Sequence, residues 1–296
     1  MKTQNKTIDV FFTANDAYAK YLCVTLISIL KNAKENECYN FYILTSGMSA
    51  KNKNKLSNIK TNIEYHIEFI NVEAKLFNNV ADSSQKHRIP KETNYRFLTS
   101  SIKPELDKCI FLDADLIVVD SLGELIDENL DDNYALAAYD FTKNVGTWHE
   151  DMNLPNGFQY RNTGVTVFNL KKWREDNIEN KLFDVAEKYG TKLRFPDQDS
   201  LNIALAPKIK RLNDSWNLLP TSSFFDIQEY DKPRIIHWAG SFKPWHYLNV
   251  KYSGEYWKYA FKSSYFAELV FGFILSATKD FRDKIRKTLL LLNYNF

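Results

Sequence analysis

The sequence predicts an α/β fold built on a single open, mostly parallel β-sheet with helices on both faces. Strand-like apolar runs alternate with helix-like segments over residues 1–130, which is the pattern of such a sheet. The 296 residues are 44% hydrophobic and 26% charged, an ordinary globular composition that is long enough to bury one large core. Polar and acidic residues directly follow two of the apolar runs, where ligands bind in open α/β sheets.

The first half of the chain supplies most of the predicted sheet. Ile8–Thr13 is an apolar run with the composition of a strand, and the apolar residues of Ala17–Asn32 recur at helical spacing. The following segments alternate in the same way: strand Phe41–Leu44, helix Ser49–Lys60, strand Ile63–Ile70, a short helix containing Tyr95–Leu98, and strand Cys109–Leu112. Since helices separate the strands, we expect mostly parallel pairing.

The second half adds fewer strands and then changes in character. We expect strands at Tyr134–Ala138, Val165–Phe168 and Ile235–Ile236, and a charged amphipathic helix over Leu170–Tyr189. Beyond residue 250 the chain becomes rich in aromatic and basic residues. We therefore predict a globular domain over residues 1–250 and a helical C-terminal segment over residues 251–296.

The C-terminal segment combines basic and apolar residues. Lys279–Lys287 contains five basic and two acidic residues and is followed by the apolar run Leu289–Leu292. Helices that lie on anionic lipid have this composition. A helix docked on the domain with a solvated charged face fits the same residues equally well.

Charge and cysteine usage exclude several classes of protein. With 39 basic and 37 acidic residues the net charge is +2, so there is no global charge for binding nucleic acid, and we expect no nucleic-acid partner. The three cysteines lack the spacing of a disulfide framework or a zinc site. The N-terminus has no apolar signal core, so we expect a cytoplasmic protein, peripheral at the inner face of the membrane if the C-terminal segment binds lipid.

Asp113 and Asp115 form an Asp-x-Asp motif directly after the predicted strand Cys109–Leu112. Two carboxylates at a strand end suit a hard divalent cation such as Mn²⁺ or Mg²⁺, which leaves positions open for phosphate oxygens. About one such tripeptide is expected by chance in a chain of this length, and Asp197–Asp199 is a second. The position after an apolar strand makes the first motif informative.

Phosphohydrolases of the haloacid-dehalogenase type also carry Asp-x-Asp after an apolar strand. Their motif usually lies on the first strand, with Thr or Val two residues after the second Asp. Here more than a hundred residues precede the motif, and Ile117 occupies that place. The hydrolase interpretation is therefore disfavoured.

A second candidate segment, His237–Trp245, follows the predicted strand Ile235–Ile236. It contains an imidazole that can bind metal, His237, a glycine that permits close backbone approach, Gly240, and an ammonium point charge, Lys243. This combination fits a metal-bound diphosphate. A lone histidine is more often structural than a ligand. The metal-ligand interpretation of His237 therefore depends on its occurrence together with Asp113 and Asp115.

Taken together, the motifs resemble glycosyltransferase family 8, the retaining, metal-dependent family that includes bacterial lipopolysaccharide galactosyl- and glucosyltransferases and the glycogenins. The likeness runs from about Ile8 to Trp245 and is strongest to the lipopolysaccharide members. It implies a nucleotide-diphospho-sugar transferase fold of the GT-A type. The segments that carry it are Asp9–Asp16, Tyr95–Phe97, Leu112–Asp115, Asn162–Val165, Asp197–Asp199 and His237–Trp245.

The resemblance implies roles for individual residues of a UDP-sugar site. Mn²⁺, or Mg²⁺ in its place, would be bound by Asp113, Asp115 and His237, with Ala114 between the two aspartates. Contacts to the diphosphate or donor sugar would come from Gly240, Lys243 and Arg96. The uridine pocket would include Thr13, Ala14, Asn15 and Tyr18. Many relatives have Asp in place of Asn15 and Asn in place of Ala17, so the uridine contacts at these two positions are in doubt.

The reacting end of the donor would lie near four further residues, Asn162, Thr163, Asp197 and Gln198. Retention requires either a nucleophile opposite UDP or attack from the same face as UDP. A carboxylate is the expected nucleophile by analogy with retaining glycosidases, and the amide of Gln198 is a weak one, so the same-face route is favoured. Asp197 would then orient sugar hydroxyls, and Asp140 is a candidate acceptor contact that fits an exposed loop residue equally well.

The function implied by the resemblance is transfer of galactose or glucose from a UDP-sugar to a glycan acceptor of the lipopolysaccharide or lipooligosaccharide type. Two alternatives stay open: a transferase of the same fold that acts on protein or glucan, and a non-catalytic nucleotide-sugar binder. Residues 142–159 are long enough for an acceptor-side lid. Four tryptophans are candidates for stacking on sugars or for simple packing: Trp148, Trp216, Trp238 and Trp245.

Overall fold

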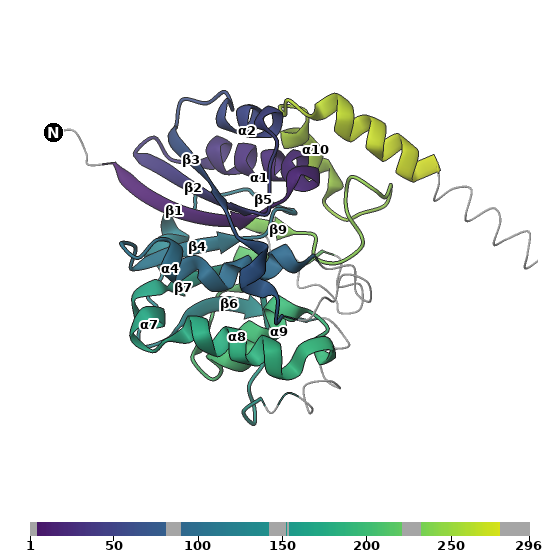
Figure 1. The fold of residues 1–296 in the computed structure, drawn as a ribbon. Coiled ribbons are helices and arrows are strands. Elements are labelled where there is room, and N and C mark those ends of the chain that lie inside the picture. Colours follow the sequence, from purple (N-terminus) through teal and green to yellow (C-terminus); the bar gives the residue numbers. More distant parts are fainter. Residues whose placement is uncertain (1–4, 81–89, 142–151, 153, 221–231, 279–296) are drawn as a thin grey trace, which may run out of the picture.

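The computed structural model describes residues 5–80, 90–141, 152, 154–220 and 232–278 (Figure 1). Seven strands form one sheet in the order β3-β2-β1-β4-β7-β6-β8. Strand β7 runs antiparallel to β4 and β6, and the other neighbouring pairs are parallel, which confirms a mostly parallel sheet. The strands are β1 (Lys6–Thr13), β2 (Glu37–Thr45), β3 (Glu64–Asn71), β4 (Lys108–Leu112), β6 (Ala135–Tyr139), β7 (Arg161–Asn169) and β8 (Ile209–Arg211).

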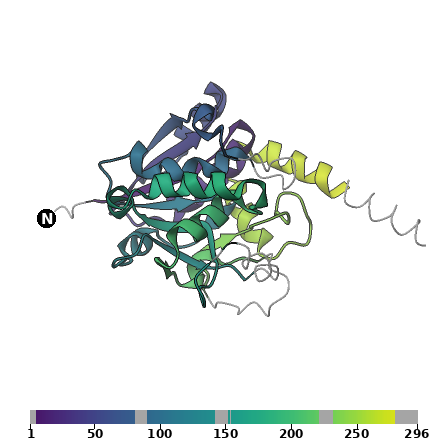
Figure 2. The same cartoon turned by 60° about the horizontal axis from the view of Figure 1, so that its bottom comes forward.

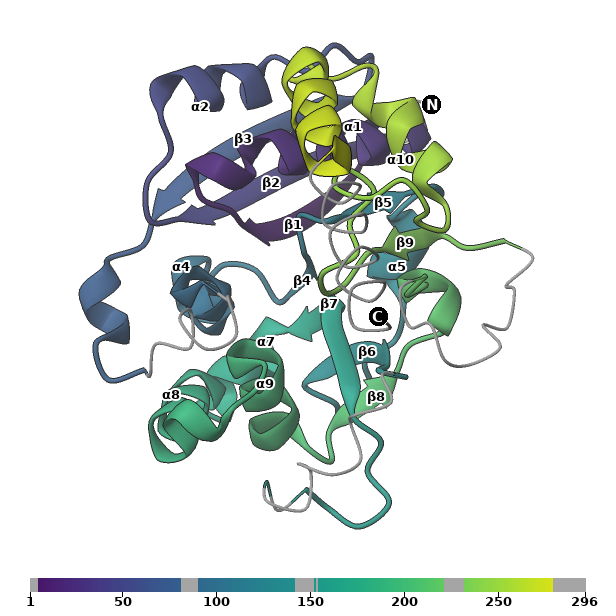
Figure 3. The ribbon, with the colours of Figure 1, turned by 90° about the vertical axis from the view of Figure 1, so that its right-hand side faces the viewer.

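Helices cover both faces of this sheet, as predicted (Figure 3). The α-helices are α1 (Ala19–Asn32), α2 (Ala50–Ser57), α4 (Thr99–Ile102), α5 (Gly123–Asp127), α7 (Leu170–Glu175), α8 (Ile178–Tyr189), α9 (Pro196–Leu205) and α10 (Ser253–Ala260). The 3₁₀ segments are η1 (Asp16–Tyr18), η2 (Ala74–Phe77), η3 (Lys91–Leu98), η5 (Gly190–Lys192) and η6 (Asp214–Asn217).

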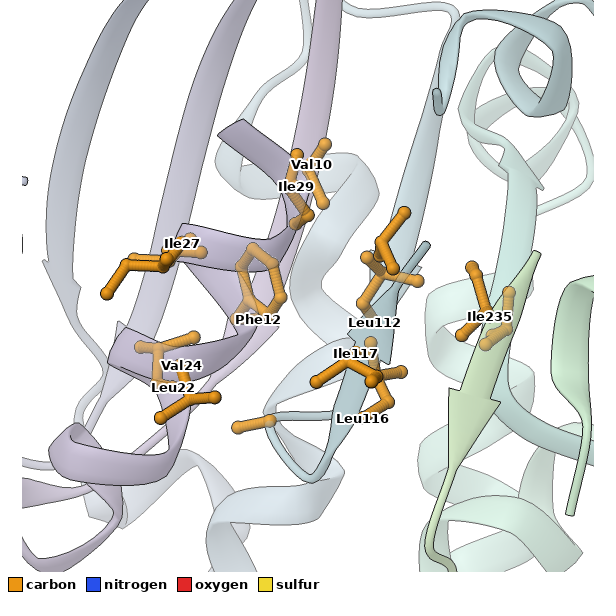
Figure 4. Packing of buried hydrophobic residues seen from close by; sticks show 14 of the residues in the cluster. Val10, Phe12, Leu22, Val24, Ile27, Ile29, Leu112, Leu116, Ile117 and Ile235 are labelled. Carbon is orange, nitrogen blue, oxygen red and sulfur yellow. The ribbon is translucent and has the colours of Figure 1, made fainter. Parts of the chain in front are cut away.

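Alternating side chains of the strands divide the interior into two apolar cores. On β1, Val10 and Phe12 belong to the core that contains α1 and α10, whereas Phe11 belongs to the core that contains α7, α8 and α9. On β4, Leu112 and Phe111 divide in the same way. Figure 4 shows Phe12 and Leu112 of the first core beside side chains of α1. Burial on both faces explains why these strands read as continuous apolar runs.

A second sheet of two strands lies against α1, with β5 (Leu116–Val118) paired antiparallel with β9 (Ile235–His237). The sequence predicts β9 but not β5. Two hydroxyls of α1 hold β5 in place. Thr25 Oγ1 donates to the Leu116 carbonyl at 2.7 Å, and Ser28 Oγ accepts from the Val118 N–H at 2.9 Å. These polar contacts satisfy backbone groups that β5, having a partner on one side, would otherwise leave unpaired in a buried place.

The helix expected over Leu170–Tyr189 is two helices rather than one. The chain leaves helical geometry at Asn177, whose φ of 52° is left-handed, and α8 starts in a new direction. Asparagine tolerates this conformation better than most residues. The buried residues step by five from Trp173 to Ile178, which departs from the three- or four-residue spacing of a single helix. Helix α9 and strand β8 were not expected at all, because both are short and carry mixed polar and apolar residues.

The described part of the C-terminal segment packs on α1. Tyr256 and Ala260 of α10, with Tyr265 and Leu269 beyond it, are buried in the same core as Phe12. A helix over residues 266–278 then runs out to the edge of the molecule, coloured yellow in Figure 2. The basic run and the final apolar residues, 279–296, lie outside the described residues, as do residues 142–151 and 153 of the expected acceptor-side lid. Among the described residues, no helix has the length and apolar character needed to cross a bilayer.

Candidate active site

The two motifs singled out by the sequence come together where β4 ends and β5 begins. Asp113 and Asp115 occupy the turn between these strands, and the β5–β9 pairing places His237 opposite Leu116. One ligand atom from each of Asp113, Asp115 and His237 lies within 4.8 Å of the others. Asp113 and His237 are 124 residues apart in the sequence, and the pairing of β5 with β9 brings them together.

His237 is almost completely buried, and its two ring nitrogens face different groups. Nε2 lies 3.2 Å from Asp115 Oδ1 and 3.6 Å from Asp113 Oδ2. Nδ1 lies 3.0 Å from Oδ1 of Asn217 on η6. A histidine whose Nδ1 is held by a second residue while Nε2 faces carboxylates has the usual arrangement of a metal ligand.

Strand β7 passes directly under this cluster because Gly164 has no side chain. A Cβ added at Gly164 would lie 2.1 Å from His237 Cε1 and 2.8 Å from Asp113 Oδ2. The Gly164 carbonyl accepts from the Asp113 N–H at 2.8 Å, which fixes the turn that carries the motif. The close approach of β7 therefore depends on glycine at this position.

Arg96, buried on η3, joins Asp113 to Asp197 of α9. Its Nη2 lies 2.7 Å from Asp113 Oδ1 and 3.1 Å from Asp197 Oδ2, and its Nη1 donates to the Thr163 carbonyl at 3.0 Å. The guanidinium also lies over the Phe111 ring, 4.6 Å from its centroid. Burial raises the pKa of the Asp197 carboxyl, an effect that Arg96 opposes. Arg96 thus places positive charge between two carboxylates at the base of the site.

Lys243 supplies a second buried cation. Its ammonium forms an ion pair with Oδ2 of Asp115 and donates to the Trp238 carbonyl. Burial favours a raised pKa for the Asp115 carboxyl, but the Lys243 ammonium is the largest opposing cause, and that pKa is held well below its usual range. Asp115 is therefore a carboxylate at neutral pH. Gly240, between Trp238 and Lys243, has a φ of 80° and lets the chain turn back.

Gln198, in the first turn of α9, has its side-chain amide fixed at both ends. Its Oε1 accepts from the Thr163 N–H at 3.1 Å, and its Nε2 donates to Asp140 Oδ2 at 3.0 Å. Asp140 Oδ2 also accepts from Asn162 Nδ2 at 3.2 Å. The residues expected at the reacting end of the donor therefore form one connected group, and Asp140 belongs to it.

Asp199 of the second Asp-x-Asp motif has a structural role. Its Oδ2 accepts from the backbone N–H groups of Arg194 and Phe195, at 2.7 and 2.9 Å, and its Oδ1 accepts from the Tyr160 hydroxyl. Tyr160 in turn accepts from Gln198 Nε2 at 3.3 Å. The fully buried Asp199 therefore stabilises the start of α9 and the orientation of Gln198.

The expected uridine residues follow β1 at the same edge of the sheet. Thr13 ends β1, its Oγ1 is buried, and it has no hydrogen-bond partner among the described residues. Asn15 caps η1 by accepting from the Tyr18 N–H at 3.1 Å. Burial raises the pKa of Tyr18, with smaller contributions from the charges of Asp115 and Asp113, so this hydroxyl lies within electrostatic reach of the acidic motif.

The structure also shows where the remaining predicted residues lie. Ala114 is buried in the apolar core, and its carbonyl accepts from Thr25 Oγ1 at 3.3 Å. Trp216, Trp238 and Trp245 are buried in that core, whereas Trp148 lies outside the described residues. All three cysteines are free, as expected. Ala14 is also buried, with its N–H bonded to the Leu44 carbonyl at 3.1 Å.

Sequence reasoning missed Asn217 and Tyr160 as parts of the site, and it gave no role of its own to Gly164, which lies in the Asn162–Val165 motif. Asn217 lies on a short 3₁₀ segment with no motif around it, and Tyr160 precedes a strand. Only Gly164 had a signal, a glycine in the middle of an apolar strand, which often marks a close approach of two chain segments.

The arrangement suits chemistry on a phosphorylated ligand. Three ligands for a divalent cation lie beside two buried cations, and polar side chains from β6, β7 and α9 gather on the adjoining side. Fixed positive charge in a water-poor site stabilises negative charge that develops on a leaving group. The family model of glycosyl transferase family 8 matches residues 9–249, which include all of these residues.

The chain belongs to glycosyltransferase family 8. It is 29% identical over 249 residues to a putative glycosyltransferase of Haemophilus influenzae, covering 82% of this chain and 74% of that protein. It is 26% identical over 268 residues to a lipopolysaccharide 1,2-glucosyltransferase of Escherichia coli, covering 86% of this chain and 78% of the relative.

The fold of this family-8 chain is similar to that of a solved galactosyltransferase, LgtC. A structure of LgtC with donor and acceptor sugar analogues superimposes with a TM-score of 0.75 at 27% identity, over 87% of this chain and 96% of LgtC. An active-site mutant of LgtC, in which a glutamine is replaced by glutamate, gives 0.76 with the same coverage. These likenesses confirm both the family and the GT-A type of fold that the sequence predicts.

Proposed function

We propose that the protein is a retaining hexosyltransferase that moves galactose or glucose from a UDP-sugar to a glycan acceptor of the lipopolysaccharide type. The observation that carries the proposal is the Asp113, Asp115 and His237 cluster at the ligand-binding edge of a family-8 fold. The donor and acceptor classes are supported by the E. coli lipopolysaccharide glucosyltransferase and by LgtC, which are similar along most of their length.

The residues of the cluster fit a divalent cation. Asp115 Oδ1 is buried without a hydrogen-bond partner in the part of the chain that the structure describes, and it lies 3.2 Å from His237 Nε2. Two carboxylates and an imidazole nitrogen suit Mn²⁺, and Mg²⁺ with lower preference. When bound, the cation would neutralise charge on the UDP leaving group.

Two cationic side chains beside the cluster would bind and orient the remaining parts of the donor. Lys243, already desolvated against Asp115, would place its positive charge beside the diphosphate, and Arg96 would orient Asp197 toward the sugar. The fixed positions of these side chains mean that little reorganisation accompanies bond cleavage.

The orientation of Gln198 favours attack from the same face as UDP. Its Oε1, the nucleophilic atom of the amide, already accepts from the Thr163 N–H, which is an obligate donor. Attack by Oε1 on the donor carbon would weaken that bond, so we assign Gln198 to orienting Asp140 and the donor sugar. Asp140 is held in place by Gln198 and Asn162, and it would contact the hydroxyl group of the acceptor.

We propose that the C-terminal segment binds the anionic surface of the membrane that carries the acceptor. The helix over residues 266–278 exposes Phe271, Ile274 and Leu275, each more than half exposed. An open apolar groove of about 500 Å³, lined by Trp257 of α10 and by Phe266 and Phe273 of this helix among others, lies between the two helices. The basic run that follows in the sequence supplies the charge that anionic lipid attracts. A location at the inner face of the cell membrane follows from this proposal.

The first experiment is the release of UDP from a panel of UDP-sugars, with Mn²⁺ and with a chelator. Release from a single UDP-hexose that stops on chelation is the expected result, and it names the donor. Asp113→Ala and Asp115→Ala should each abolish this release, whereas Asp184→Ala, an exposed carboxylate of α8, should leave it unchanged.

Two outcomes would contradict the proposal. Full turnover in Asp113→Ala or Asp115→Ala would overturn the metal assignment. Metal-dependent UDP binding with no turnover of any donor, even with lipooligosaccharide acceptors present, would favour the nucleotide-sugar binder instead.

A further inference from the structure

We infer that Asn217 is a positioning residue that fixes the tautomer of His237, so that Nε2 presents a lone pair to the metal. This inference rests on the metal site of the proposed function. It concerns a residue on η6 that the sequence did not indicate, and it follows from the direction of a chain of hydrogen bonds through the site.

The direction of this series of hydrogen bonds is set by a backbone N–H group, which can only donate. The Gly164 N–H donates to Asn162 Oδ1 at 3.1 Å, so that atom is an acceptor and the amide of Asn162 has one orientation. Its other end agrees, since Asn162 Nδ2 lies 3.2 Å from the carboxylate Oδ2 of Asp140. The orientation of Asn162 is therefore fixed at both ends.

The fixed amide of Asn162 fixes Asn217 in turn. Asn217 Nδ2 donates to the same Asn162 Oδ1 at 2.9 Å, which leaves Asn217 Oδ1 to face His237 Nδ1 at 3.0 Å. Because that oxygen accepts, Nδ1 must carry the proton. In the neutral ring Nε2 is then unprotonated, and it lies 3.2 Å from the unpartnered Asp115 Oδ1. A lone pair facing a carboxylate oxygen is repulsive until a cation lies between them.

Burial makes the arrangement depend on Asn217. Asn217 is 3% exposed and His237 is 1% exposed, so water cannot readily replace the amide oxygen. Groups that hold the second nitrogen of a ligating histidine typically change metal affinity about 10- to 100-fold when removed. Leucine is close to asparagine in size but accepts no hydrogen bond. Aspartate keeps the acceptor for His237 Nδ1 and gives up the bond that Asn217 Nδ2 donates to Asn162.

The test compares Mn²⁺ affinity, measured by calorimetry and electron paramagnetic resonance, in Asn217→Leu and Asn217→Asp. We expect Asn217→Leu to bind Mn²⁺ about 10- to 100-fold more weakly and Asn217→Asp to recover most of the affinity. Asn202→Leu is the matched control, because Asn202 is equally buried and bonds the backbone of Arg161 on β7 but does not contact His237. It should leave Mn²⁺ affinity unchanged.

A second measurement reads the tautomer without metal. Long-range ¹H–¹⁵N spectra of the metal-free protein should show the neutral ring of His237, assigned by its loss in His237→Gln, as the Nδ1–H form in the wild type and as a mixture in Asn217→Leu. An Nε2–H form in the wild type, or unchanged Mn²⁺ affinity in a folded Asn217→Leu, would overturn the inference. Failure of the wild type itself to bind Mn²⁺ would instead remove the metal site of the proposed function.

Discussion

At the scale of single residues, Arg96 shows how the site depends on opposed buried charges. Its guanidinium lies between Asp113 and Asp197, within 2.7 and 3.1 Å of their carboxylate oxygens. Removing the cation leaves two carboxylates close together with little water. The loss of one partner from a buried ion pair is usually far more costly than the loss of a surface pair.

We expect Arg96→Met to lower the free energy of unfolding by about 3 kcal/mol in urea denaturation. Asp197→Asn added to this variant should restore part of the loss by removing one of the unpaired charges. Since burial raises the pKa of Asp197, the deficit of Arg96→Met should shrink as pH falls and the carboxyl takes up a proton. A double variant no more stable than Arg96→Met would contradict this account.

Gly164 matters for steric reasons, because the site leaves no room for a side chain at this position. A methyl group at this position would meet His237 Cε1 at 2.1 Å, so either β7 or the His237 ring must move. We expect Gly164→Ala to lose Mn²⁺ binding and donor turnover by at least about tenfold. The control is Gly254→Ala on α10, where an added Cβ meets nothing within 4 Å and alanine should leave the site intact. Normal Mn²⁺ binding in Gly164→Ala would show that the ring can shift at no cost.

At the scale of elements, α9 is held by its first turn rather than by a continuous apolar face. Asp199 accepts from the backbone N–H groups of Arg194 and Phe195, and Tyr160 donates to it, so one carboxylate joins α9 to the residues before it and to the start of β7. Helix α9 then delivers Asp197 and Gln198 to the site. The second Asp-x-Asp motif, Asp197–Asp199, therefore has a structural residue, Asp199, beside one that faces the site, Asp197.

Asp199→Ala should therefore affect both stability and catalysis. The loss of three buried hydrogen bonds predicts a destabilisation of about 2–4 kcal/mol in urea denaturation, and a fall in kcat as Gln198 loses its orientation. Asp184→Ala on the exposed side of α8 should change stability by less than about 0.5 kcal/mol. Equal stability of the two variants would show that α9 is held by other contacts.

At the scale of the whole molecule, the C-terminal segment and the sugar-binding domain share one core. Tyr256 and Leu269 pack in the same cluster as residues of β1 and α1, yet the outer side of the helix over residues 266–278 stays apolar and exposed. Exposed apolar patches of this kind usually mark a binding surface. In the function proposed above, this patch would hold the enzyme at the membrane surface that carries the acceptor.

Sedimentation with vesicles that contain anionic lipid tests this surface. We expect Phe271→Ser combined with Leu275→Ser to weaken vesicle binding by about tenfold or more, because each side chain would lose apolar burial in the bilayer interface. Leu76→Ser, an equally exposed leucine on η2, is the control. Turnover of UDP-sugar with a water-soluble acceptor should be unaffected, and unchanged vesicle binding would contradict the proposal.

The apolar strands and the residues of the candidate site could be predicted from the sequence. Buried parallel strands must be apolar on both faces, so β1, β2 and β4 could be recognised, and the polar residues that follow them mark one edge. Asp113, Asp115 and His237 could be predicted as metal ligands because each follows an apolar strand and because their motifs occur in the order typical of the family, and the structure brings these three side chains together. Local pattern and strand ends are properties of short stretches of chain, and a single sequence records them.

Which polar groups meet, and in what orientation, depends on the tertiary structure. The β5–β9 pairing, the close approach at Gly164 and the bond between Asn217 and His237 join segments that are far apart in the chain. The break at Asn177 differs, because the five-residue step from Trp173 to Ile178 is a local signal in the sequence. Hydrogen-bond direction and steric fit depend on positions in three dimensions, and such contacts leave no periodic trace in the sequence.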